Sequence, residues 1–207
     1  MNSKQLYYKL LSEKLIEEFA KRNIEGEYFE SKEDALKKII ETTPSNATIS
    51  CGGSETLHEI GLIEQLRKGP YSFLDPLAGE AGAEKEKVAY QALTADYFFM
   101  GCNAITETGE LVNIDGIGNR VAALCFGPKH VIIVAGMNKV MPDLESAINR
   151  AEVQASKMIV LKFSNQLSSF DELHNAALSA GSQLVITRRS IYKNRIKVIL
   201  VGESLGY

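Results

Sequence analysis

The residues best suited to chemistry gather in one stretch of the chain, Ala95 to Lys139. Two hydrophobic runs, Tyr97–Met100 and Val131–Val134, bracket most of it, and each is typical of a buried strand. Between the runs lie polar residues that are costly to bury without partners: Asn103, Thr106, Glu107, Asn113, Asp115, Asn119 and Arg120. Glycines are interleaved with them at Gly101, Gly109, Gly116 and Gly118. Such a segment between buried strands either makes turns or builds a site.

Three charged side chains in this stretch suggest a chemistry. Glu107 and Asp115 are candidate catalytic residues, as an acid–base pair or a nucleophile, if burial separates their pKa values. The alternative is that these carboxylates are solvated or cap a turn. Arg120 is suited to hold a carboxylate or phosphate through two parallel hydrogen bonds. Equally, Arg120 could form a structural ion pair with Asp115 or Glu107.

Two further motifs favour an anion. Gly52-Gly53-Ser54 follows a predicted strand and opens a predicted helix, where backbone amides and a hydroxyl suit a phosphate or carboxylate. The alternative is a tight turn with Ser54 as the helix N-cap. Lys139 follows the strand Val131–Val134 and could neutralise an anion, or it could be an ordinary surface lysine.

The run from Ile114 to Arg120 superficially resembles a dinucleotide-binding fingerprint. Its third glycine is missing, because position 121 is valine, and no strand-length run directly precedes it. We therefore exclude dinucleotide binding. The expected ligand-binding residues are Gly52, Gly53, Ser54, Asn103, Thr106, Asn113, Gly116, Asn119, Arg120 and Lys139.

Composition narrows the class of protein. The chain has 207 residues, a net charge of −3 and no basic stripe, which argues against a general nucleic-acid binder. No apolar run is long enough for a membrane span, and the first residues are too charged for a signal peptide, so we expect a cytoplasmic protein. Cys51, Cys102 and Cys125 are widely spaced and the histidines are dispersed, so we predict no metal site and no bound cofactor.

The elements that position these residues alternate between strand and helix. Helices are predicted at residues 3–22 and from Ser31 to about Glu41, and strands at Ala47–Cys51, Tyr71–Leu74, Tyr97–Met100 and Val131–Val134. Further strands are predicted at Met158–Phe163, Leu184–Thr187 and Ile196–Val201. This order predicts a single α/β domain over residues 1–207, with a mainly parallel sheet between helical layers and N-terminal helices packed on it over residues 1–42. In such a sheet ligands bind beyond the carboxyl ends of the strands, which is where the candidate residues fall.

The central stretch, together with CGGSETLHEIGL upstream and the terminal VILVGESLGY, resembles the lactate-utilisation (LUD) domain family. The resemblance covers most of residues 1–160 and the last dozen residues. It implies the fold class shared by glucosamine-phosphate and ribose-phosphate isomerases and coenzyme A transferases. It also implies a role in growth on L-lactate, beside other subunits of an iron–sulfur complex that oxidises lactate to pyruvate. The spacing of Gly101, Ile105, Gly109 and Gly116 is more distantly similar to methylthioribose-phosphate isomerases.

The sequence departs from the family pattern in the cysteines that could bind an iron–sulfur cluster. Many small relatives carry a cysteine-rich stretch before the terminal strand, whereas residues 160–195 contain no cysteine here. We therefore expect no iron–sulfur cluster in this chain. Three hypotheses follow: a lactate-utilisation component that binds a small anionic metabolite, a stand-alone isomerase- or transferase-like enzyme acting on a phosphorylated or coenzyme A-linked metabolite, and a non-catalytic assembly subunit. A homo-oligomer is compatible with each.

Overall fold

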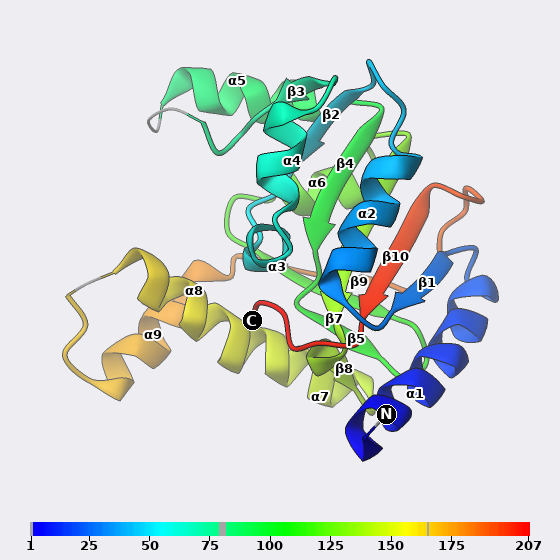
Figure 1. The fold of residues 1–207 in the computed structure, drawn as a ribbon. Helices are drawn as coiled ribbons and strands as arrows, with labels where there is room; N and C mark the ends of the chain where they lie inside the picture. The colour runs from blue at the N-terminus through cyan, green and yellow to red at the C-terminus, as the bar shows by residue number, and fades with distance from the viewer. Residues whose placement is uncertain (1, 79–81, 165) are drawn as a thin grey trace.

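A fully parallel sheet forms the centre of the molecule (Figure 1). The computed structural model describes residues 2–78, 82–164 and 166–207. The strand order of the large sheet is β1-β10-β7-β4-β2-β3. The strands are β1 (Glu25–Phe29), β10 (Ile196–Val201), β7 (His130–Gly136), β4 (Tyr97–Gly101), β2 (Thr48–Cys51) and β3 (Ser72–Leu74).

Helices cover both faces of this sheet, because successive strand side chains point to opposite sides. On β4, Phe98 and Met100 pack in one core and Phe99 packs in the other. The first core includes residues of α1 (Ser3–Ala20) and α6 (Asn119–Cys125), and the second includes residues of α2 (Lys32–Thr42), α3 (Glu55–Glu59) and α4 (Leu62–Lys68). The predicted three-layer α/β architecture with a packed N-terminal helix is thereby confirmed.

A smaller sheet stands beside the large one, with the strand order β8-β5-β6-β9. Its strands are β8 (Val140–Met141), β5 (Ala104–Thr106), β6 (Leu111–Asp115) and β9 (Gln183–Thr187). It packs through small alanines, such as Ala104 and Ala147, against α7 (Leu144–Asn149) and η2 (Arg150–Ala155). The helical path continues into α8 (Ser156–Phe163), and α9 (Phe170–Ala180) lies beside α8. The remaining elements are α5 (Ala83–Ala92) and the short η1 (Met137–Lys139).

Three sequence predictions of local structure were wrong. Met158–Phe163 was predicted as a strand but is helix α8, because a short apolar run carries no period that distinguishes the two. No strand was predicted within the polar central stretch, which contains strands β5 and β6. Strand β6 leads directly into Gly116, so the absence of a preceding strand was not a valid reason to exclude dinucleotide binding. The absence of the third glycine remains a valid reason to exclude dinucleotide binding.

Candidate functional site

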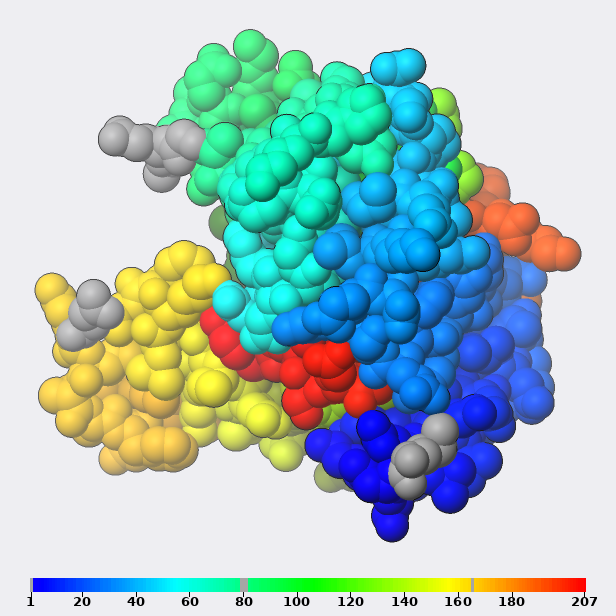
Figure 2. All heavy atoms as spheres, viewed as in Figure 1, coloured from blue at the N-terminus to red at the C-terminus, as the bar shows by residue number. Residues whose placement is uncertain are grey.

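A cavity of about 430 Å³ lies at the carboxyl ends of β2 and β4, between the large sheet and the smaller one. The space-filling view shows the molecule hollowed between the α5 region and the α8–α9 region (Figure 2). Predicted site residues that line the cavity are Gly53, Ser54, Asn103, Asp115, Gly116, Asn119, Arg120 and Lys139. The sheet therefore gathers residues that are up to 86 positions apart in the chain, counted from Gly53 to Lys139.

Four predicted residues do not line this cavity. Glu107 pairs with Lys14 at 2.9 Å and remains partly exposed. Thr106 is fully buried, and its hydroxyl accepts from the Glu110 amide at 2.9 Å. Asn113 and Gly52 do not line the cavity but lie next to Arg120. Asn113 accepts a hydrogen bond from Arg120, and a side chain at Gly52 would collide with the stem of Arg120.

Arg120 is held by the protein on all sides of its guanidinium. Nη1 donates to the Gly101 carbonyl at 3.2 Å and to Asn113 Oδ1 at 3.0 Å. Nη2 donates to Asn103 Oδ1 at 2.9 Å and to the Ile114 carbonyl. Nε lies 3.5 Å from Asp115 Oδ2. Because a guanidinium has five N–H groups, this geometry matches the structural ion pair of the two sequence alternatives.

Asp115 is the other half of this arrangement. Its carboxylate accepts from the amides of Gly118 at 3.0 Å and Val121 at 3.2 Å, which fixes the turn into α6. Gly118 has a φ of 89°, a backbone conformation that glycine adopts without strain. Asp115 is thus a buried, oriented carboxylate at the cavity wall, and a purely solvated role is excluded.

The glycine–serine turn supports the same wall. A Cβ atom at Gly52 would lie 2.9 Å from Arg120 Cδ, whereas a Cβ at Gly53 would meet nothing within 4 Å. Ser54 Oγ accepts from the Leu57 amide at 3.4 Å, so Ser54 acts as the N-cap of α3. A Cβ at Gly101 would lie 2.5 Å from Ser54 Oγ, so glycine is needed there for the close approach of the two segments.

Lys139 is the most unusual side chain at the cavity. It follows β7 in η1 and is only 2% exposed. Its Nζ donates to Thr56 Oγ1 at 2.9 Å, and among the described residues no carboxylate forms an ion pair with it. Burial is the main reason that the pKa of Lys139 is lowered from 10.5 to about 8; Arg150 and Arg120 act in the same direction, and Cys102 and Glu59 act against it.

Sequence reasoning missed Arg150, a second buried cation near the cavity. It is 5% exposed, its Nη1 donates to the Asn103 carbonyl, and burial lowers its pKa. Arg150 is the first residue of η2, which is a π-helix. Short π-helical segments recur at functional sites. Cys102, which lies near these cations, donates its S–H toward the Ala104 carbonyl at 3.0 Å, and burial raises the pKa of its thiol.

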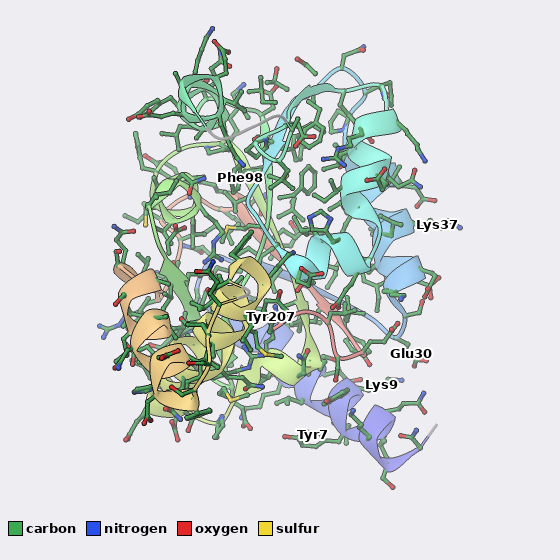
Figure 3. The ribbon with its side chains drawn as sticks, turned by 90° about the vertical axis from the view of Figure 1, so that its left-hand side faces the viewer. Tyr7, Lys9, Glu30, Lys37, Phe98 and Tyr207 are labelled. Carbon is green, nitrogen blue, oxygen red and sulfur yellow. The ribbon has the colours of Figure 1, made fainter. Side chains whose placement is uncertain are left out.

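The segment Leu205–Tyr207 passes beside Lys139 and contributes Tyr207 to the cavity lining. The Gly206 amide donates to Glu59 Oε2 at 2.7 Å, and the Leu205 amide donates to Asn138 Oδ1 at 3.1 Å. Tyr207 lines the cavity and is labelled near α8 in Figure 3. In the sequence this segment carries part of the family resemblance, and no local pattern in it indicates a residue of a cavity wall.

The opposite wall is apolar and comes from α8. Ser156, Ile159 and Phe163 recur at helical spacing, so they share one face of the helix, and all three line the cavity. A second cavity of about 630 Å³, lined in part by Leu77, Leu93 and Tyr90, adjoins the first and shares Gly53, Ile117 and Asn119 with it. Among the described residues no group of three or more His, Cys, Asp or Glu side chains is placed to hold a metal ion.

A family model described as the LUD domain matches residues 12–201. The chain belongs to the LUD domain family. Among solved structures, this LUD-domain chain is similar to a DUF162 family protein from Deinococcus radiodurans, with 13% identity, a TM-score of 0.52, and coverage of 95% of this chain and 98% of the other. A weaker likeness is to ribose 5-phosphate isomerase A from Neisseria gonorrhoeae, with 14% identity, a TM-score of 0.42, and coverage of 85% and 95%.

No match was found among curated proteins. The likeness to the DUF162 protein shows a shared fold. Within the described part of the LUD-domain chain, no helix is long and apolar enough to cross a membrane.

Proposed function

We propose that this LUD-domain protein binds a small anionic metabolite in the 430 Å³ cavity and serves L-lactate or related 2-hydroxy-acid utilisation. The observation that carries the first part is Lys139, a buried ammonium group at the cavity wall with a hydroxyl as its hydrogen-bond partner. Burying a cation without a counter-charge is costly, and an anion in the cavity would offset that cost.

The surrounding charge favours the same class of ligand. Arg150 and Arg120 both act to lower the pKa of Lys139, so two further cationic groups lie near its amine, while Glu59 acts in the opposite direction. Two unit charges at 4 Å attract by about 4 kcal/mol at an effective dielectric constant of 20, so an anion placed here would gain substantially. Asp115 adds one negative charge, but its carboxylate is already bound by two amides and Arg120.

The shape of the cavity supports a small ligand with an apolar side. Its volume falls within the range of small-molecule sites, which is about 300–1,000 Å³. Ile159 and Phe163 of α8 provide an apolar wall facing the polar one. A short carboxylic acid with an aliphatic substituent matches both walls. The assignment to lactate rests on family membership, and other lactate-utilisation subunits are the proposed partners.

One observation favours a second candidate function. The adjoining 630 Å³ cavity would admit the remainder of a longer ligand, such as a phosphorylated or coenzyme A-linked metabolite. Asp115, as an oriented carboxylate, would then be the candidate catalytic residue of an isomerase- or transferase-like reaction. For an assembly subunit without a ligand, the buried Lys139 would have no explanation.

A thermal-shift panel tests the proposal. L-lactate, pyruvate, inorganic phosphate, a sugar phosphate and acetyl-coenzyme A are each added at millimolar concentration. A ligand at about 100 times its dissociation constant should add about 2.7 kcal/mol of stability. We expect at least one anion to stabilise the wild type, and Lys139→Met to lose most of that shift.

The matched control is Lys129→Met. Lys129 directly precedes β7 and Lys139 ends η1, which directly follows it, so the two lysines flank opposite ends of one strand. The side chain of Lys129 is 75% exposed and pairs with Asp96, so its removal should leave the shift intact. No shift with any anion, or an equal shift in both variants, would contradict the proposed site. Growth of a deletion strain on L-lactate, complemented by either variant, tests the metabolic role.

A further inference from the structure

We propose that the amine of Lys139 condenses with the carbonyl group of an aldehyde- or ketone-bearing anion and holds it as an imine. The inference rests on the proposed anion site and narrows its ligand to anions that also carry a carbonyl. It assigns Lys139 a covalent role that goes beyond neutralising charge.

The first support is the placement of the nitrogen. Lys139 is one of the residues that line the cavity, and its Nζ donates to the Thr56 hydroxyl at 2.9 Å. A neutral amine can keep that hydrogen bond as donor and still direct its lone pair into the cavity. Lys139 sits in η1, between strands β7 and β8, so its backbone is held by both sheets.

The second support is that other nucleophilic side chains at the cavity are engaged. The thiol of Cys102 is fully buried and directed at the carbonyls of Ala104 and Val112. The Ser54 hydroxyl accepts from the Leu57 amide at 3.4 Å, as a helix cap. Among the cavity-lining residues that the structure describes, Lys139 is therefore the nucleophile best placed to reach a ligand.

The third support is the protonation state. With a pKa of about 8 in place of 10.5, the neutral amine fraction at pH 7 is about 300-fold larger, from the difference between the two values. Lysines desolvated beside another cation are a recognised route to amine nucleophiles. The charged or titratable groups facing Lys139 are Glu59, Cys102, Arg120 and Arg150; the two arginines favour the neutral amine, and Cys102 and Glu59 oppose them.

The step balances without a further reagent. The amine lone pair forms the N–C bond, and the carbonyl oxygen takes a proton to give a carbinolamine. The oxygen then leaves as water with the second amine proton, which gives the C=N bond. The anionic group of the ligand would remain in the positive field of Arg150 and Arg120. The bound carbonyl compound would thereby be activated at the adjacent carbon.

Reductive trapping tests this inference. The full chain is incubated with glyoxylate, pyruvate or dihydroxyacetone phosphate and sodium cyanoborohydride, and adducts are located by peptide mass spectrometry. We expect one adduct per chain at Lys139. At ligand concentrations well below saturation, its rate should rise with pH and be half-maximal near pH 8, the pKa of Lys139 in the free protein. The two carboxylates and the phosphate distinguish which anionic group the site prefers.

Lys139→Arg keeps the charge and removes the nucleophile, so it should lose the adduct and still respond to L-lactate or inorganic phosphate in thermal shift. Lys129→Arg should retain the Lys139 adduct. Mapping of the wild type alone suffices if Lys139→Arg does not fold. Adducts at Lys129 as frequent as at Lys139 would overturn the inference.

The remaining outcomes separate the imine from the anion site. A thermal shift with L-lactate or phosphate, but no Lys139 adduct between pH 7 and pH 9, would overturn the imine and leave the anion site. Equal trapping with uncharged acetone would overturn the anion requirement. No shift and no adduct would overturn both.

Discussion

Arg120 and Lys139, two cationic side chains at the cavity, differ in the number of hydrogen-bond acceptors that the protein provides for them. Arg120 has a protein acceptor for each part of its guanidinium, whereas the described partner of Lys139 Nζ is a single hydroxyl. Residue type and position in the sequence did not distinguish them. The difference depends on where Gly101, Asn103 and Asn113 place their oxygen atoms, which is a property of the fold.

Arg120→Ala should therefore act mainly on stability. Removing one partner of a buried ion pair leaves the other charge unpaired and costs about 3–5 kcal/mol of unfolding free energy. Urea denaturation measures the loss. The control is Arg188→Ala, because Arg188 is 73% exposed and lies 3.8 Å from Glu110, so its removal should cost little. An Arg120→Ala protein of normal stability that no longer binds anions would instead make Arg120 an anion ligand.

Lys139→Met should change how stability depends on pH. Because the folded pKa is lowered from 10.5 to about 8, the unfolded chain binds more protons between these values, and stability rises with pH across that window. Below pH 8 the buried ammonium costs about 3 kcal/mol, from the difference between the two pKa values. In the absence of ligand, Lys139→Met should be more stable than the wild type at pH 7, by up to that amount. Its advantage should shrink towards pH 10.5, and a difference independent of pH would refute the explanation.

At the scale of elements, the two glycines in the turn between β2 and α3 differ in the space that each has for a side chain. Gly52 faces the stem of Arg120, whose head group is fixed, and Gly53 faces open space. Gly52→Ala should therefore destabilise the protein by about 1–3 kcal/mol through overpacking. Gly53→Ala is the matched control and should be close to neutral. Chemical denaturation of the two variants compares them, and equal losses would show that the turn itself, and not Arg120, requires glycine.

The sequence was sufficient for elements with a clear period or a long apolar run. The parallel strands Thr48–Cys51, Tyr97–Gly101 and His130–Gly136 were predicted to within a few residues, and so was helix Lys32–Thr42. Strand Glu25–Phe29 was missed because an edge strand that is only partly buried shows little alternation.

The structure brings only some of the predicted site residues together at one cavity. Gly53 and Lys139 were identified because they follow predicted parallel strands, where such sheets bind ligands, and Asp115 because it lies in the polar segment between two of those strands. Glu107 is directed away because it follows β5 in a hairpin whose register no local signal fixed. Arg150 and Thr56 were missed because they come from within helices, and only tertiary packing brings them to Lys139.

At the scale of the whole molecule, the cavity joins two sheets that pack through separate cores. Gly53 and Ser54 come from the large sheet's side, and Asp115, Ile159 and Phe163 come from the smaller sheet and α8. A ligand in the cavity contacts both, so binding should reduce local opening of the less buried side. The exposed Met158 and Leu161 of α8 indicate that this side is the less buried one.

Hydrogen exchange should report this coupling. Addition of a stabilising anion should slow amide exchange in α8 (Ser156–Phe163) and in Leu205–Tyr207. Helix α1 (Ser3–Ala20) contributes no residue to the cavity among those that the structure describes, and its exchange should not change. Uniform slowing over the chain would indicate general stabilisation without a site, and no change in α8 would place the anion elsewhere.

The central claim, that a buried ammonium group meets the anion, is tested most directly by the pKa of Lys139 itself. NMR titration of ¹³Cε-labelled lysine, with the resonance assigned through Lys139→Met, gives this value with and without the most stabilising anion. We predict a midpoint near pH 8 for the free protein and a higher midpoint with the anion bound, because the ligand charge stabilises the ammonium. A midpoint near the ordinary 10.5 that a saturating anion does not move would contradict the account.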